Sequence, residues 1–171
     1  MKRLAVMLAL SAAACSGEPA TKAPAATDGA SAAPQTAAPA QPAGLTGLYE
    51  GGQAPRRNQL CVTQDGETLR FGLVVWGAGQ NSCSGIGTAT RDRDRLRLAM
   101  AGDEACRIDA TLGADGAIML PSRTPAGCAY YCGAGANMAG VRLERAGGGA
   151  EAARRARDLV GEPLCGAQES S

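Results

Sequence analysis

The chain has no histidine, and it has no lysine after residue 44. Nucleophilic systems that rely on a Ser–His or Ser–Lys pair are therefore excluded from residues 45–171. Aromatic residues make up only 3% of the chain, which argues against a roomy ligand cavity, because such cavities are lined by apolar and aromatic side chains. No apolar run reaches the roughly 20 residues that a membrane-spanning helix needs.

Neither sign of charge dominates. Residues 45–171 contain 14 arginines and 14 acidic residues. This balance argues against a nucleic-acid binder, which would need a basic excess. The adjacent carboxylates Asp103 and Glu104 are expected to point apart within a turn, so they do not predict a catalytic acid–base pair. We expect a noncatalytic protein without a metal or other cofactor.

The N-terminal segment has the proportions of an export signal. Lys2 and Arg3 precede an apolar stretch at residues 4–14, which is too short to span a bilayer. An ordinary signal peptidase could cut after the small residues Ala12 and Ala14. Alternatively, residues 12–15 form the box that directs lipid attachment to Cys15. The total of 7 cysteines favours the second alternative, because removing Cys15 leaves an even number that can pair.

Residues 1–16 resemble bacterial lipoprotein signals. The resemblance implies that residues 1–14 are removed and that Cys15 carries a thioether-linked diacylglycerol, which anchors the protein to a membrane. The residue after the cysteine is Ser16 and not aspartate. In lipoproteins of this kind the absence of aspartate there goes with delivery to the outer membrane, so the resemblance implies the periplasmic face of the outer membrane. Residues 15–44 are rich in Ala, Pro, Thr and Ser and lack branched aliphatic side chains, so we expect a disordered tether.

Residues 45–171 are predicted to form one small all-β domain. Apolar and polar residues alternate with a period of two, as in Leu69, Phe71 and Leu73, and Asp–Gly turns separate the runs. The expected strands are Leu45–Glu50, Asn58–Gln64, Thr68–Trp76, Ser84–Arg91, Arg95–Met100, Cys106–Leu112, Ala117–Leu120 and Val141–Arg145. Consecutive hairpins favour a small antiparallel up-and-down barrel of about eight strands, because closure removes exposed edges; an open sandwich is the alternative.

One C-terminal helix is expected over Ala150–Val160. The segment contains good helix formers, and Gly161 and Pro163 follow it. Its apolar face would consist of Ala152, Ala153, Ala156, Leu159 and Val160.

Six cysteines remain in the domain, namely Cys61, Cys83, Cys106, Cys128, Cys132 and Cys165. Three disulfides are the default in an exported domain. Metal binding by Cys128 and Cys132 is the alternative, but their spacing differs from that of a zinc knuckle and no histidine is available. In an up-and-down meander, alternate strands start at the same end of the barrel. All of these cysteines except Cys61 are therefore expected to lie at one barrel end. Cys128 and Cys132 are expected to have different partners, because a bond between them would constrain little chain.

Two segments could carry contacts. Tyr130 and Tyr131 lie within residues 128–140, and they could either plug one barrel end or form a contact surface. Trp76 precedes the loop 77–81 and could be either a packed strand end or a ligand rim.

These features together favour a noncatalytic, lipid-anchored module of the cell envelope. We expect it to present a disulfide-stapled surface to a periplasmic protein or a peptidoglycan component. Its general plan of signal, anchored cysteine, small barrel and disulfide is similar to that of the small periplasmic lysozyme-inhibitor lipoproteins, in architecture only. A small-ligand-binding barrel and a structural lipoprotein without a discrete ligand are the alternatives.

Overall fold

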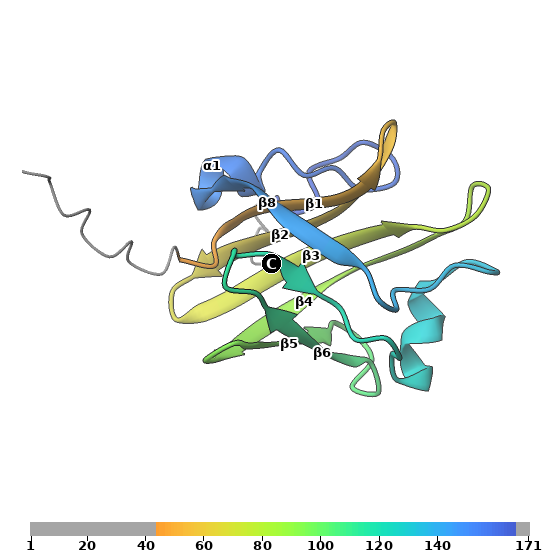
Figure 1. The fold of residues 1–171 in the computed structure, drawn as a ribbon, viewed down its shortest axis with the longest axis horizontal. Coiled ribbons are helices and arrows are strands. Elements are labelled where there is room, and N and C mark those ends of the chain that lie inside the picture. The colour runs from red at the N-terminus through yellow and green to blue at the C-terminus, as the bar shows by residue number, and fades with distance from the viewer. Residues whose placement is uncertain (1–43, 167–171) are drawn as a thin grey trace, which may run out of the picture. The chain divides into compact units, whose positions relative to one another are not determined.

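The computed structural model describes residues 44–166 of the chain. Predictions for the signal segment, for Cys15 and for the tether up to residue 43 lie outside the described residues. Eight antiparallel strands form a closed barrel in which each strand pairs with the next and β8 pairs with β1 (Figure 1). The predicted up-and-down barrel is therefore confirmed. The strands are β1 (Gly47–Gln53), β2 (Arg56–Asp65), β3 (Thr68–Trp76), β4 (Ser82–Asp92), β5 (Arg95–Met100), β6 (Arg107–Leu112), β7 (Ile118–Met119) and β8 (Arg142–Gly148).

Every strand boundary lies within three residues of the predicted one, and β7 has half of its predicted length. The prediction of a strand over Ala117–Leu120 is too long, because β7 contains only Ile118 and Met119. The flanking residues bond elsewhere. The carbonyl oxygen of Ala117 accepts the N–H of Gly113 within the β6–β7 turn, and the N–H of Leu120 donates to Val141, ahead of β8.

Side chains fill the barrel interior. Alternate residues of each strand point inward, as the period of two predicts, and they form one buried cluster. Its largest fully buried members include Tyr49, Leu60, Phe71, Leu73, Leu96, Leu98, Ile108, Ile118, Leu120, Met138 and Leu143. Within residues 44–166, no helix is both long and apolar enough to cross a bilayer.

A tyrosine–arginine clasp joins β1 to β8 at the start of β1. Tyr49 and Arg145 are opposite each other in the ladder, and the guanidinium lies 5.5 Å from the ring centroid. The Tyr49 hydroxyl donates to the carbonyl of Leu45 at 2.8 Å and accepts from Arg145 Nη1 at 3.0 Å, while Arg145 Nη2 donates to Thr46 at 3.1 Å. Burial raises the pKa of the Tyr49 hydroxyl, which keeps it protonated as a donor.

A second, smaller apolar layer covers the outside of β2 and β3. The segment after β8 lies on this face, where it forms a cluster separate from the interior. The cluster contains Leu48, Cys61, Val74, Ala152, Ala153, Ala156, Leu164 and Cys165. Gly72 allows the close approach, because a Cβ atom there would lie 2.6 Å from Cγ of Leu164.

The C-terminal helix is much shorter than predicted. Helix α1 spans Gly149–Ala153 only, and Leu159 and Val160 are exposed by 44% and 82%, so the prediction that they share its buried face is wrong. After the helix the chain doubles back, so that the N–H of Leu164 donates to Ala156 and Arg157 pairs with Pro163. A short helix has little stability of its own. Here the hydrogen bonds of the returning chain outweigh the helix propensity of the residues after Ala153.

All six described cysteines form disulfides, in the pairs Cys61–Cys165, Cys83–Cys132 and Cys106–Cys128. The predictions of three bridges and of separate partners for Cys128 and Cys132 are confirmed. The prediction that Cys165 joins the other cysteines at one barrel end is wrong. Cys61 lies between the inward-facing Leu60 and Val62, so its sulfur atom faces outward into the second layer. There it forms the disulfide with Cys165.

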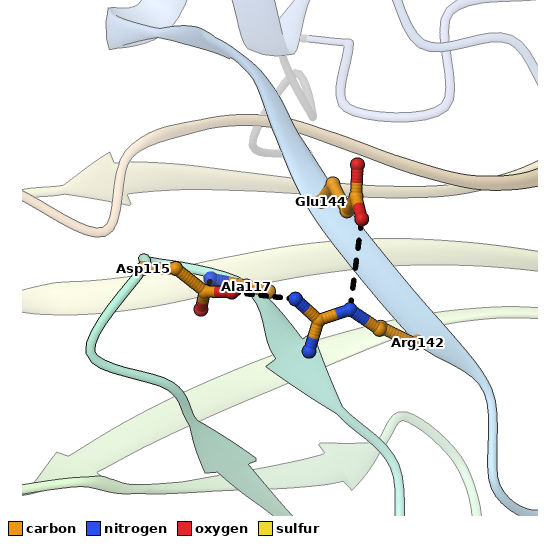
Figure 2. Close-up of polar contacts among 4 residues, drawn as sticks. All are labelled: Asp115, Ala117, Arg142 and Glu144. Atoms are coloured by element: carbon orange, nitrogen blue, oxygen red, sulfur yellow. Dashed lines mark hydrogen bonds and ion pairs between the residues drawn. The ribbon is translucent and has the colours of Figure 1, made fainter.

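An ion pair fastens the β6–β7 turn to β8 (Figure 2). Asp115 accepts the N–H of Ala117 at 3.0 Å and Nη2 of Arg142 at 2.5 Å, while Arg142 Nε lies 3.6 Å from Glu144. The hydrogen bond from the Ala117 N–H makes the largest contribution to lowering the pKa of Asp115, and the Arg142 guanidinium lowers it further. A lowered folded-state pKa adds stability that is present above the unfolded-state pKa and is lost as the pH falls through the folded-state pKa.

Replacing Asp115 with Asn is therefore expected to lower the melting temperature modestly at pH 7 and to have a smaller effect in acid. Thermal unfolding of the variant and the wild type at pH 7, 4 and 2.5 measures this. Asp92→Asn, at the end of β4, is the control. A difference between Asp115→Asn and wild type that stays constant down to pH 2.5 would contradict the assignment.

Candidate functional site

One end of the barrel carries the disulfide-linked connections. We call this end the stapled pole; it consists of the loop 77–81, the turn 101–105 and the segment 125–140. The segment contains a 3₁₀ helix, η1 (Ala126–Tyr131), and Figure 1 shows it at the lower right, on the same side of the barrel as the tips of the hairpins β1–β2 and β3–β4. Cys132 is bonded to Cys83 at the start of β4, and Cys128 is bonded to Cys106 just before β6. The N–H of Gly133 also donates to Ser82 at 2.8 Å. Disulfides thus fix the segment at Cys128, within η1, and at Cys132, directly after it.

Tyr131 closes the barrel at this pole. Its hydroxyl donates to the carbonyl of Ala101 at 2.8 Å, and the half-buried ring packs against the interior cluster. Gly85 leaves room for it, since a Cβ atom there would lie 3.1 Å from Cδ1 of Tyr131 and 2.7 Å from Cε of Met100. Desolvation, followed by the charge of Asp103, raises the pKa of the Tyr131 hydroxyl, so it remains a donor at neutral pH. This residue has the plugging role that the sequence left open.

Tyr130 has the opposite position. Its side chain is 83% exposed, although it lies only two residues after the buried Cys128. The edge-to-face contact with Tyr131, at 5.5 Å between ring centroids and 86° between planes, supports it from one side. Each of the two roles that the sequence allowed is therefore taken by one tyrosine: Tyr131 plugs the barrel, and Tyr130 projects from the stapled pole.

A shallow groove of about 700 Å³ runs beside Tyr130. Ser82 and Ser84 alternate with the inward Cys83, so they lie on the outer face of β4. The described residues that line it are Gln80, Asn81, Ser82, Ser84, Tyr130, Tyr131, Cys132, Gly133 and Leu159. Among residues 44–166, the lining contains amides, hydroxyls, two aromatic rings and one leucine side chain, and it contains no charged side chain.

Trp76 lies in a different pocket. The guanidinium of Arg56 is 5.4 Å from the Trp76 ring centroid and donates to the carbonyl of Gly79. The backbone N–H of Trp76 donates to Oδ1 of Asn58 at 2.8 Å. Its side chain packs against the outer apolar layer. The adjoining pocket of about 200 Å³ is lined by Pro55, Arg57, Gln59, Val74, Trp76, Arg157 and Asp158. The structure therefore separates Trp76 from the two tyrosines.

Sequence reasoning missed three residues of the groove. Ser82 and Ser84 could have been placed outward by their alternation with Cys83, but serines in a strand carry no functional signal by themselves. Leu159 was assigned to the buried face of a helix, and only the reversal of the chain after α1 brings it to the groove.

The groove is suited to noncovalent recognition. Amide and hydroxyl groups can each donate and accept hydrogen bonds, and Tyr130 offers an open aromatic face. The alternative of a metal site at Cys128 and Cys132 is overturned, because both sulfur atoms are held in disulfides with other partners. Comparison of the chain with protein-family models, with curated protein sequences and with solved structures finds no match.

Proposed function

We propose that this protein is a noncatalytic, lipid-anchored module of the bacterial cell envelope that presents its stapled pole to a periplasmic protein or a peptidoglycan component. The observation that carries the proposal is the 83% exposure of Tyr130 on a segment that two disulfides hold in place. A fixed aromatic side chain offers a large contact area at a low cost in conformational entropy.

The filled interior supports recognition at the surface. A barrel that carries a small ligand needs an open lumen, whereas here the inward positions hold large side chains with almost no exposure, such as Leu60, Leu73 and Leu98. This packing favours the interaction module over the small-ligand barrel.

Lipid attachment at Cys15 would place the domain at the end of a tether. A flexible segment over residues 16–44 would have a root-mean-square reach of about 30 Å, and a polyproline-like one would approach about 90 Å. Either reach lets the domain contact partners beyond the lipid headgroups while the anchor keeps it at the membrane.

Replacing Tyr130 with Ala tests the proposal. The variant is expected to reduce capture of the partner by at least about tenfold, because a truncated contact aromatic often carries much of a binding energy. Its melting temperature should remain that of the wild type, because the side chain is mostly exposed. Capture is measured by incubating the immobilised mature protein with envelope extract and, separately, with purified sacculi.

Two variants serve as controls for this experiment. Met119→Ala truncates another exposed apolar side chain, on β7, and should leave capture unchanged. Tyr131→Ala removes a half-buried ring and a hydrogen bond, and it should cost about 2–3 kcal/mol of stability. If Tyr130→Ala captured every protein and sacculus as the wild type does, the stapled pole would not be the contact surface.

A further inference from the structure

The charge of the groove differs from that of the rest of the domain. Residues 45–171 contain 14 arginines and 14 acidic residues, yet none of those within the described residues 44–166 lines the groove. A charged ligand would lose hydration there without gaining an ion pair. The lining therefore selects for a ligand that is polar but neutral.

The hydrogen-bonding groups are distributed along a line. Ser82 and Ser84 are two residues apart on one face of β4, which separates their Cα atoms by roughly 7 Å. The amides of Gln80 and Asn81 extend this row into the β3–β4 loop. Each of these groups both donates and accepts, as do the hydroxyl and acetamido groups of an amino sugar. A row of such groups suits a chain of sugars better than a compact ligand.

Tyr130 adds a stacking surface to this row. The C–H bonds on one face of a pyranose ring carry partial positive charge, and they pack favourably on the negative face of an aromatic ring. The 83% exposure of Tyr130 leaves a ring face accessible, and its edge contact with Tyr131 restricts its orientation. The groove of about 700 Å³ is open to solvent over most of its surface, so a ligand can extend beyond it.

From these observations we infer that the groove binds a neutral glycan strand built of N-acetylated amino sugars. Tyr130 stacks on a sugar ring, Gln80 and Asn81 bond acetamido and hydroxyl groups, and Ser82 and Ser84 bond hydroxyls further along the strand. This inference rests on the proposed function, and it selects the glycan of the wall from the partners proposed above.

Titration calorimetry of the mature protein with a hexamer of N-acetylglucosamine tests the inference. The matched ligand is the glucose hexamer, which has the same linkage and lacks the acetamido groups. We expect the N-acetylated hexamer to bind at least about tenfold more tightly than the glucose hexamer, and Tyr130→Ala to weaken that binding by at least about tenfold. Glycan strands released from sacculi with their peptides still attached should compete with the hexamer, because the lactyl carboxyl groups of their sugars are then held in neutral amides.

Two amide variants add a matched comparison. Gln80→Ala should weaken binding of the hexamer by about fivefold, which corresponds to one lost hydrogen bond. Gln64→Ala removes an exposed amide near the other end of the barrel, where it bonds Gly66, and it should leave binding unchanged. Equal affinities of Gln80→Ala and wild type for the hexamer would overturn the assignment of the loop amides.

The outcomes separate this inference from the proposed function. If neither the hexamer nor the released strands bind, the glycan inference is overturned. In that case, a protein captured from envelope extract by the wild type and lost in Tyr130→Ala would still support the proposed function and identify its partner as a protein. If Tyr130→Ala equals the wild type in both calorimetry and capture, both proposals fail.

Discussion

Replacing Cys61 and Cys165 together with alanine is expected to lower the free energy of unfolding by about 4–5 kcal/mol. The bridge joins residues 104 apart in sequence, and on the chain-entropy model a loop of that length gives the largest stabilisation of the three. The melting temperature should fall by on the order of 15 °C. The loss should begin in the outer layer, where the bridge holds Leu164 over Gly72.

Unfolding by guanidinium chloride, with hydrogen exchange at the amides of Ala156 and Leu164, measures both effects. The matched variant replaces Cys106 and Cys128, which are only 22 residues apart, and the same model gives it a smaller loss of about 3 kcal/mol. Removing the bridges one at a time is necessary because a reductant would open all three. A larger loss in the Cys106–Cys128 variant would contradict the order that loop length predicts.

Replacing Cys15 with Ser is expected to release the protein completely from the membrane fraction. One acyl chain gives only marginal binding, whereas the several chains that a lipoprotein cysteine carries anchor stably, so removal of their attachment site removes the anchor. Mass spectrometry of the mature wild-type protein should find an acylated Cys15 at its N-terminus. Fractionation of cells that produce the full-length protein measures the change in location.

The neighbouring residue supplies the control for this change. Ser16→Asp keeps the attachment cysteine, so the protein should stay in the membrane fraction, and the resemblance to lipoprotein signals implies a move from the outer to the inner membrane. An unmodified mature chain that begins at Cys15 or Ser16 would contradict lipid attachment and favour cleavage by an ordinary signal peptidase.

The barrel could be predicted because its determinants are local. Alternation of the kind seen at Leu69, Phe71 and Leu73 identifies a strand and its inward face, and Asp–Gly turns set hairpin connections within a few residues. In a meander, alternate strands start at the same barrel end. This alone predicts that Cys83 and Cys106 lie at the same end as the 128–132 segment.

The outer layer could not be predicted, because it depends on contacts distant in sequence. The pattern of β2 turns Cys61 away from the interior, but nothing near Cys61 indicates that Cys165 will cover it. The same layer ends α1 after Ala153 and carries Leu159 to the groove. The groove combines β4, the β3–β4 loop, η1 and this returning segment, so no single stretch of sequence contains its pattern.

The polarity of β1 determines how the domain would bear a mechanical load. Residue 44 lies at the barrel end opposite the stapled pole, and β1 runs from there towards the pole while paired on both sides, with β2 and with β8 (Figure 1). A pull between an N-terminal anchor and a partner held at the pole would act along β1. It would strain the hydrogen bonds of both ladders at once, instead of opening them one after another. The clasp between Tyr49 and Arg145 lies where that force would enter, so it would add resistance to shear if the proposed anchor and partner pulled on the domain.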